Sequence, residues 1–219
     1  MPPPSRRAPS APERQRDADR TRRALLDAAR AEFAAKGLAG ARVNEIADRA
    51  GVNKQLISYY FGGKQALYDA LVEEWLTQER ELRSPDIDLG ELVCRYLAVC
   101  RAQPELQRLF VRENLDADLT GIGAEPDSED LAEMAEHKAR GEIADEIDPA
   151  YLLLVLQAAV SASVIFPADV KRHLGLEPDS DEFFRHADAQ LRLIVRRLAR
   201  GFCDDGNGPT AAGGDQTKR

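Results

Sequence analysis

Side chains that could read a nucleic-acid surface gather on one face of a short segment near the N-terminus: Lys54, Gln55, Ser58 and Tyr59. Lysine can donate a hydrogen bond to guanine O6 or N7, and glutamine can pair with adenine through two hydrogen bonds. Ile57 and Phe61 have the spacing of the opposite, buried face of the same helix. The segment therefore indicates a polar and aromatic helix face turned toward a partner rather than a catalytic centre.

The helix that carries this face belongs to a pair. Ile46, Ala47 and Ala50 have the spacing of one face of a preceding helix. Gly51 follows at the position where a left-handed residue ends many helices, and Asn53 can accept a hydrogen bond from the first N–H groups of the next helix. Two short helices joined in this way, the second with polar side chains outside, predict a helix-turn-helix that reads the major groove.

Signatures of catalysis and metal binding are missing from the sequence. It contains no H-E-x-x-H, no G-x-S-x-G and no complete P-loop. The histidines are scattered, and none has ligand spacing to a cysteine or to another histidine: His137, His173 and His186. We therefore expect no enzyme activity, no cofactor and no metal. A protein-binding adaptor is the other alternative, and the basic N-terminal region and the polar helix face count against it.

The charges of the chain are divided unevenly. The 219 residues carry a net charge of −8, with 31% charged and 43% apolar residues. Residues 1–64 hold 13 Lys and Arg against seven Asp and Glu, a net +6, so the rest of the chain carries −14. A basic head on an acidic body is typical of a DNA-binding module joined to a separate domain.

The cysteines and the N-terminus indicate the compartment. Cys94, Cys100 and Cys203 form no C-x-x-C pair, and an odd number outside any framework favours a reducing cytoplasm. The first twenty residues are rich in Pro and Arg and have no apolar stretch of a secretory signal. Cys94 and Cys100 are expected as small helix residues, and a redox-sensing role for either stays an alternative.

The pattern along the chain predicts an all-α protein in four parts. Residues 1–16 form a disordered basic arm, which is either a solvated tail or a loose cationic extension along DNA. Residues 17–64 form the helix-turn-helix domain, 65–200 a helical body, and 201–219 a disordered tail. The first expected helix spans residues 17–36 and is followed by the helix-turn-helix pair. Further helices are expected at 64–82, 88–102, 104–119, 129–143, 150–168, 168–174 and 180–200.

The most apolar segment runs from residue 150 to residue 168 and carries no formal charge. Its 19 residues could span a bilayer by length alone. Gln157, Ser161 and Ser163 interrupt it, and its N-terminal flank is acidic rather than basic. We therefore expect no membrane contact, and we interpret the segment as a helix buried at the centre of the body.

A longer stretch around the pair of helices carries a resemblance to a known family. The run IADRAGVNKQLISYYFGGKQALYDAL, preceded by TRRALLDAARAEFAAKG, resembles the N-terminal signature of the TetR family of one-component transcriptional regulators. The match extends from about Thr21 to about Leu76. It implies a DNA-binding head of three helices, a helical body that dimerises, and repression as the default activity.

The resemblance also implies roles for individual residues. The positions matching Lys54, Gln55 and Ser58 face base edges, and Asn44 approaches them from the preceding helix. The positions matching Tyr59 and Tyr60 lie along the DNA backbone, although Tyr60 could instead pack under the turn. Lys64 matches the residue that caps the fourth helix and meets a phosphate.

The chain departs from the family pattern at three places. Arg42 stands where the family often has a Thr that would form a capping box with Glu45, so Arg42 could contact a phosphate directly. Ser58 stands where the family often has Tyr, which affects base preference. Gly62-Gly63 replaces Pro-Ser and could loosen the hinge before the next helix.

For the body, the resemblance implies a homodimer and a small-molecule effector. The family dimerises through its last two long helices, here 149–166 and 180–200, so two recognition helices would meet a pseudo-palindromic double-stranded operator. An effector would change the spacing of the two heads through the 64–82 helix and weaken operator binding. Possible lining residues, each of which could instead be plain core, are Tyr96, Phe110, Met134, His137, Gln157 and Phe166.

Overall fold

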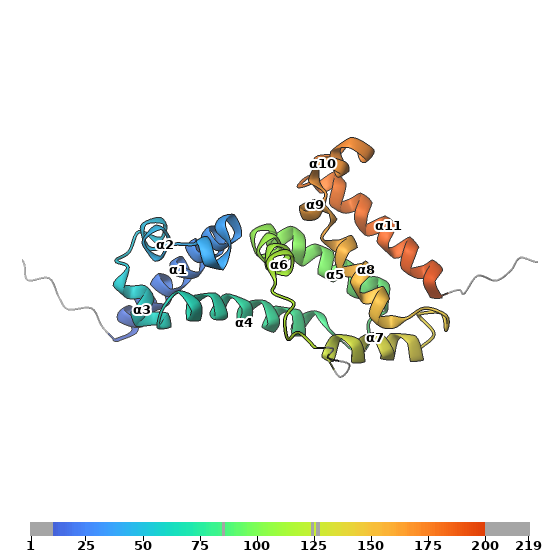
Figure 1. The fold of residues 1–219 in the computed structure, drawn as a ribbon, viewed down its shortest axis with the longest axis horizontal. Coiled ribbons are helices and arrows are strands. Elements are labelled where there is room, and N and C mark those ends of the chain that lie inside the picture. Colours follow the sequence, from blue (N-terminus) through green and yellow to red (C-terminus); the bar gives the residue numbers. More distant parts are fainter. Residues whose placement is uncertain (1–10, 85, 124, 126–127, 200–219) are drawn as a thin grey trace, which may run out of the picture.

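The computed structural model describes residues 11–84, 86–123, 125 and 128–199 of the chain, and within them it contains helices and no strand (Figure 1). The all-α prediction is therefore confirmed. The helices are α1 (Ala11–Gly40), α2 (Val43–Ala50), α3 (Gln55–Phe61), α4 (Lys64–Leu82), α5 (Leu89–Ala102), α6 (Pro104–Asp116), α7 (Glu129–Ala139), α8 (Pro149–Val160), α9 (Ala162–Ile165), α10 (Pro167–Asp169), the π-helix η1 (Val170–Leu174) and α11 (Asp181–Ala199).

The first helix is longer than the sequence predicted. It begins at Ala11, so the expected disordered arm of residues 1–16 is wrong for residues 11–16, and residues 1–10 lie outside the described part. Pro12 lies in the first turn, where its missing N–H is not needed, and the residues that follow favour helix. The helix breaks at Gly37, as predicted, where φ is 69°.

The head is a bundle of α1, α2, α3 and α4 around one apolar core. Its fully buried members include Phe33 of α1, Ile46 of α2, Ile57 of α3 and Leu67 of α4. The body also contributes to this core through Leu106 and Leu109 of α6, which lie in the same cluster. The predicted division after residue 64 therefore runs through a single core.

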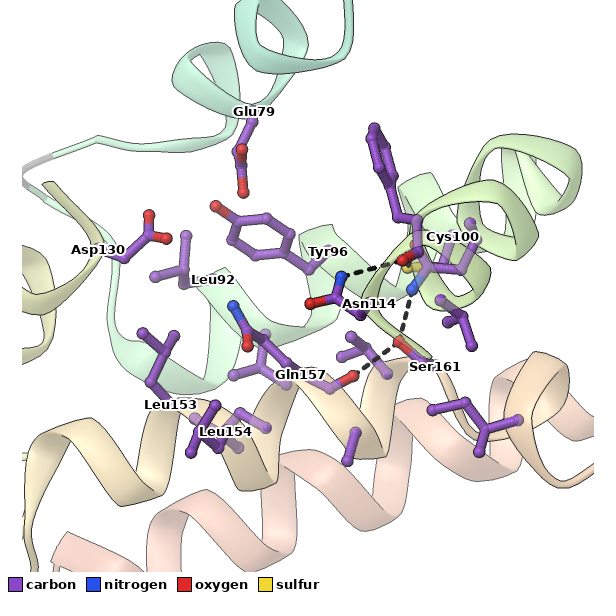
Figure 2. A pocket seen from close by; sticks show the side chains of 18 of the residues that line it. Glu79, Leu92, Tyr96, Cys100, Asn114, Asp130, Leu153, Leu154, Gln157 and Ser161 are labelled. Atoms are coloured by element: carbon purple, nitrogen blue, oxygen red, sulfur yellow. Dashed lines mark hydrogen bonds between the residues drawn. The ribbon is translucent and has the colours of Figure 1, made fainter. Parts of the chain in front are cut away.

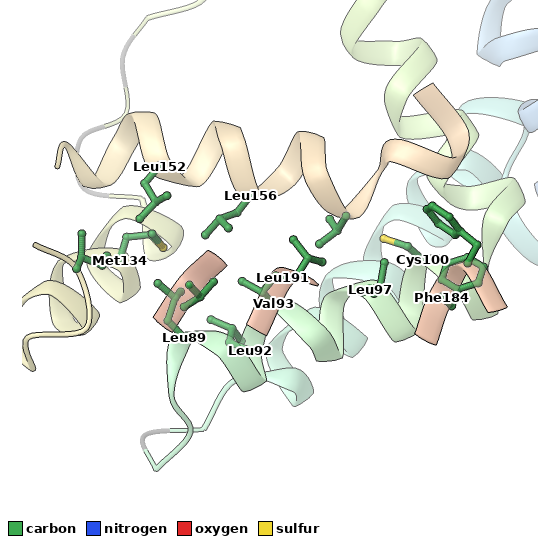
Figure 3. Close-up of a cluster of buried hydrophobic side chains, with 14 of the residues drawn as sticks. Leu89, Leu92, Val93, Leu97, Cys100, Met134, Leu152, Leu156, Phe184 and Leu191 are labelled. Atoms are coloured by element: carbon green, nitrogen blue, oxygen red, sulfur yellow. The ribbon is translucent and has the colours of Figure 1, made fainter. Parts of the chain in front are cut away.

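The body has its own core where α5, α7, α8 and α11 meet (Figure 3). Leucines of α5 occupy its middle, between Leu152 and Leu156 of α8 and Leu191 of α11. Asp88 caps α5, since its carboxylate accepts a hydrogen bond from the N–H of Glu91 at 2.7 Å. The last long helix, predicted at 180–200, is α11, and residues 200–219 lie outside the described part.

The apolar segment at 150–168 differs from its prediction. It is not one helix, because α8 ends at Val160 and the short helices α9 and α10 follow. It is also not buried on all sides: Tyr151 is 68% exposed and Leu154 is 61% exposed. Because nearly every residue of this segment is apolar, its composition did not show which helix face is buried in the core and which is exposed on the single chain. No helix of the described residues combines the length and the apolar character needed to cross a bilayer.

Candidate DNA interface and ligand cavity

The turn between α2 and α3 has the predicted geometry. Gly51 adopts φ 68° and ψ 30°, a left-handed conformation that suits glycine, and its N–H donates to the Asp48 carbonyl at 3.1 Å. The Asn53 Oδ1 atom accepts a hydrogen bond from the N–H of Gln55 at 2.9 Å. Ile57 is fully buried, so α3 is fixed in its orientation on the head.

This orientation leaves six of the eight predicted DNA-contacting side chains exposed on the head: Arg42, Asn44, Lys54, Gln55, Ser58 and Tyr59. Helix α3 lies at the end of the molecule far from α11 (Figure 1). Arg42 precedes α2 in an extended conformation and makes no side-chain cap, as the sequence indicated. These side chains form the recognition face, and their contacts with DNA stay predictions.

The two tyrosines of α3 have different environments. Tyr59 is 78% exposed, whereas Tyr60 is half-buried and packs against the head core. Their rings meet edge to face, with centroids 4.9 Å apart. This packing favours the second of the two alternatives for Tyr60, that it packs under the turn, and it also sets the Tyr60 ring against that of Tyr59. A contact of Tyr60 with the DNA backbone stays a prediction.

The side chain of Lys64 turns inward. Its Nζ donates hydrogen bonds to the carbonyls of Leu38 at 2.7 Å and Ala41 at 3.1 Å, and it lies 3.4 Å from that of Ala39. Because α1 ends at Gly40, these carbonyls at and just after its end have no further helical N–H to accept from, and an ammonium group satisfies them. In this structure Lys64 joins the end of α1 to the start of α4. The contact of Lys64 with a phosphate stays a prediction, and the structure adds a second role for this lysine, in holding the end of α1.

Gly62 and Gly63 form the turn between α3 and α4. Their φ angles are 90° and 143°, values that residues with a side chain rarely adopt and that the proline of the family pattern cannot reach. The departure from Pro-Ser therefore corresponds to a different backbone. A further residue near α3 is Arg22 of α1, whose guanidinium lies 5.1 Å from the centre of the Phe61 ring. The arginine-rich run around it was visible in the sequence, but which arginine meets α3 depends on helix packing.

The body contains a cavity of about 530 Å³ between α4, α5, α6, α7 and α8 (Figure 2). This volume lies within the range of small-molecule sites. Four of the six residues named as possible lining are in its wall: Tyr96, Phe110, Met134 and Gln157. Most of the rest of the wall is apolar, with Trp75 and several leucines.

The other two residues named as lining are outside the cavity wall. His137 is 2% exposed, and its Nδ1 lies 3.0 Å from Oε2 of Glu142 on the loop after α7. Phe166 is 51% exposed at the junction of α9 and α10. The residue type alone did not show whether a side chain would lie on the helix face, or at the end of the segment, that meets the cavity.

One group of polar atoms in the wall is already paired internally. The amide Nε2 of Gln107 donates to Oγ of Ser161, which in turn donates to the carbonyl of Gln157 at 2.7 Å. The thiol of Cys100 donates to Oε1 of Gln107 at 3.3 Å. These contacts fix the position of Gln107, which is buried.

The acidic group of the wall lies where α4 meets α7. Its three carboxylates belong to Glu79, Asp130 and Glu133. Burial raises the pKa of Glu79 and of Glu133 above the ordinary value of a glutamate. The guanidinium of Arg83 contacts Asp130 and Glu133 from beside the cavity. Figure 2 shows the Tyr96 hydroxyl pointing toward the Glu79 carboxylate.

Cavity and head share side chains. The rings of Trp75 and Phe110 lie 5.2 Å apart, and both line the cavity while packing against the head core. Trp75 is on α4, the helix that starts directly after the α3 turn. An occupant of the cavity would therefore contact the same helix that positions α3.

The buried thiols do not favour redox sensing. Burial raises the pKa of both Cys94 and Cys100 to about 12, so little reactive thiolate forms near neutral pH. Both residues are at most 5% exposed. They act here as small core residues, the first of the two alternatives.

A helix-turn-helix with an exposed polar face, joined by one helix to a body that holds a cavity, defines a one-component transcriptional regulator. The model of the bacterial regulatory proteins, tetR family, matches residues 25–71. The HTH-type transcriptional repressor SCO4008 of Streptomyces coelicolor is 32% identical over 197 residues, which cover 86% of this chain and 98% of that protein. The HTH-type transcriptional regulator RutR of Escherichia coli is 29% identical over 195 residues, covering 83% and 92%.

Solved structures agree with these relatives. The crystal structure of the transcriptional regulator SCO4942 from Streptomyces coelicolor superimposes with a TM-score of 0.63 at 25% identity, covering 81% of this chain and 97% of that one. The chain belongs to the TetR family of transcriptional regulators, as the sequence signature indicated. The relatives named above are regulators of transcription.

Proposed function

We propose that this protein is a homodimeric repressor that binds a pseudo-palindromic operator and is released from it when a small molecule enters the body cavity. The observation that supports this most is the continuity of α4, which begins at the α3 turn and carries Trp75 in the cavity wall. The name of the relative SCO4008, a transcriptional repressor, favours repression over activation. We also propose a cytoplasmic location, because the chromosome is there.

The recognition face would divide its work between bases and phosphates. Lys54, Gln55 and Ser58 would meet base edges in the major groove, joined by Asn44 from α2. Phosphates would be met by Arg42, Tyr59 and Lys64, with Tyr60 placing the ring of Tyr59. The exposure of the first four side chains and of Arg42 and Tyr59 supports this division.

The dimer would form through α8 and α11. Both helices carry large apolar side chains that a single chain leaves in water: Tyr151, Leu154, Val155, Leu193 and Ile194. Such surfaces in a folded protein mark contacts with a partner. A second copy related by two-fold symmetry would cover both surfaces at once and present two copies of α3, about 34–36 Å apart, to successive major grooves.

Release would follow from coupling through the shared core. A ligand that binds one arrangement of α4 and α6 better than another shifts the population toward that arrangement. Phe110 of α6 packs against Trp75 of α4, and Leu106 and Leu109 of α6 lie in the head core. Movement at the cavity would therefore change the positions of the two heads in the dimer.

DNA binding and dimerisation are the parts of this proposal to test first. Binding is measured by fluorescence anisotropy of labelled duplex DNA from the region upstream of the gene, at several salt concentrations. We expect tight binding that weakens steeply with salt, because phosphate contacts release counterions. Light scattering on the same sample should give the mass of a dimer. A monomer, or a protein that ignores duplex DNA even at low salt, would exclude the proposed function.

A further inference from the structure

The cavity wall carries charge of one sign. Glu79, Asp130 and Glu133 all line it, and among the described residues of the wall there is no Lys, Arg or His. The three carboxylates come from α4 and α7, which face each other at one end of the cavity. An occupant therefore meets negative charge at that end and largely apolar surface elsewhere.

Arg83 does not neutralise this group. Its guanidinium lies 3.2 Å from Glu129, 3.4 Å from Glu133, and in contact with Asp130, so one cation already serves three carboxylates. Glu79 is a fourth carboxylate, and its neighbour in the wall is the hydroxyl of Tyr96 (Figure 2). An excess of negative charge remains at this end of the cavity.

Burial of these groups makes a cationic partner favourable. The pKa of Glu79 and that of Glu133 are raised by loss of solvent, which means that their charged forms lack the stabilisation that water provides. A positive centre brought by a ligand would restore it. One N–H of the Gln107 amide already donates to Ser161, so this group keeps a single further donor for an anion.

The remainder of the cavity wall independently indicates the apolar character of the ligand. Trp75, Tyr96 and Phe110 supply three aromatic rings, and leucines of α5 and α8 surround them within about 530 Å³. Aromatic faces attract cations, and the attraction is stronger where water is excluded. Apolar rings beside carboxylates suit a molecule that is itself apolar and positively charged.

We propose that the effector of this cavity is an organic cation with an aromatic or apolar body, its positive centre lying against Glu79 and Asp130. This inference rests on the proposed function, because it names the chemical class of the effector. Neutral apolar compounds and organic anions are the alternatives that the test must separate.

The chain provides its own reporter for the test. Trp75 is the single tryptophan of the sequence and lies in the cavity wall, so quenching of its fluorescence reports occupancy of this site. The probes are tetraphenylphosphonium and tetraphenylborate, which have nearly the same shape and opposite charge. We expect the cation to quench Trp75 with at least tenfold higher affinity than the anion.

Variants locate the positive centre. Glu79→Gln should weaken binding of tetraphenylphosphonium at least tenfold and change tetraphenylborate binding much less. Glu129→Gln is the matched control, because Glu129 also contacts Arg83 but its side chain is 78% exposed and lies outside the cavity wall. That variant should bind the cation within about twofold of the wild type.

Equal affinity for the two probes, preference for the anion, absence of quenching by either, or an unchanged Glu79→Gln variant would each overturn the inference. Operator binding is measured separately on the same samples by DNA anisotropy. A protein that binds DNA but not the cation refutes the ligand class alone, whereas a protein that binds no DNA refutes the proposed function.

Discussion

Lys64 and Lys54 lie ten residues apart and should respond differently to the same substitution. Lys64→Ala removes an ammonium that donates to the Leu38 and Ala41 carbonyls, while Lys54 is exposed at the start of α3. The first change should lower the stability of the head. The second should leave stability unchanged and weaken DNA binding.

The size of the effect follows from the contacts. A hydrogen bond from a charged group contributes about 1.5–3 kcal/mol, and ordering a lysine side chain costs about 2 kcal/mol, so losing two good bonds costs a net of about 1–4 kcal/mol. For chains of this length, each kcal/mol moves Tm by about 2–4 °C. Lys64→Ala should therefore lower Tm by about 2–16 °C, and Lys54→Ala by less than about 2 °C.

The assay is thermal unfolding by circular dichroism at matched protomer concentration, because dimerisation shifts Tm. DNA anisotropy on the same preparations gives the binding loss of each variant. A Lys64→Ala protein with the Tm of the wild type and weakened operator binding would refute the structural role of Lys64. It would return this lysine to a phosphate contact alone.

Three further predictions concern other parts of the molecule. Tyr151→Ser combined with Leu193→Ser should shift the dimer toward monomer in analytical ultracentrifugation and weaken operator binding at least tenfold; an unchanged mass would exclude the α8–α11 interface. Asn53→Ala should destabilise the head by about 1 kcal/mol in chemical unfolding, because α3 loses the cap that accepts the Gln55 N–H, and an unchanged midpoint would show that the cap contributes nothing. Burial raises the pKa of Glu79, so the folded state retains this proton at a pH where the unfolded chain releases it. That contribution to stability is present at low pH and is lost as pH rises through the raised pKa. Glu79→Gln should therefore increase Tm more at pH 7 than at pH 4. An equal increase at both pH values would contradict the raised pKa of Glu79.

The helix-turn-helix could be predicted from the sequence because the residues that determine it are close together in the chain. Gly51 ends a helix, Asn53 caps the next, and Ile57 fixes which face is buried, and all three act within a few residues of their own position. The structure agrees with each. The start of α1 was missed because the Pro- and Arg-rich composition suggested disorder, although Pro12 is compatible with a first helical turn.

Features that depend on distant parts of the chain could not be predicted. The inward turn of Lys64 requires the carbonyls that the end of α1 at Gly40 leaves open 23 to 26 residues earlier. The contribution of Leu109 to the head core requires knowing that α6 packs on α1. The carboxylates of the cavity were missed because Glu79 and Asp130 look like surface residues of two separate helices until α4 and α7 meet.

The central claim, that the exposed face of α3 reads duplex DNA as one half of a symmetric pair, is tested most directly by selection of bound sequences from random duplexes. The wild type and Gln55→Ala should be compared in parallel. We expect the wild type to enrich two inverted half-sites, and Gln55→Ala to enrich the same arrangement with preference lost at one base position in each half. Enrichment of a single unpaired site, or the same full preference in both proteins, would contradict the account.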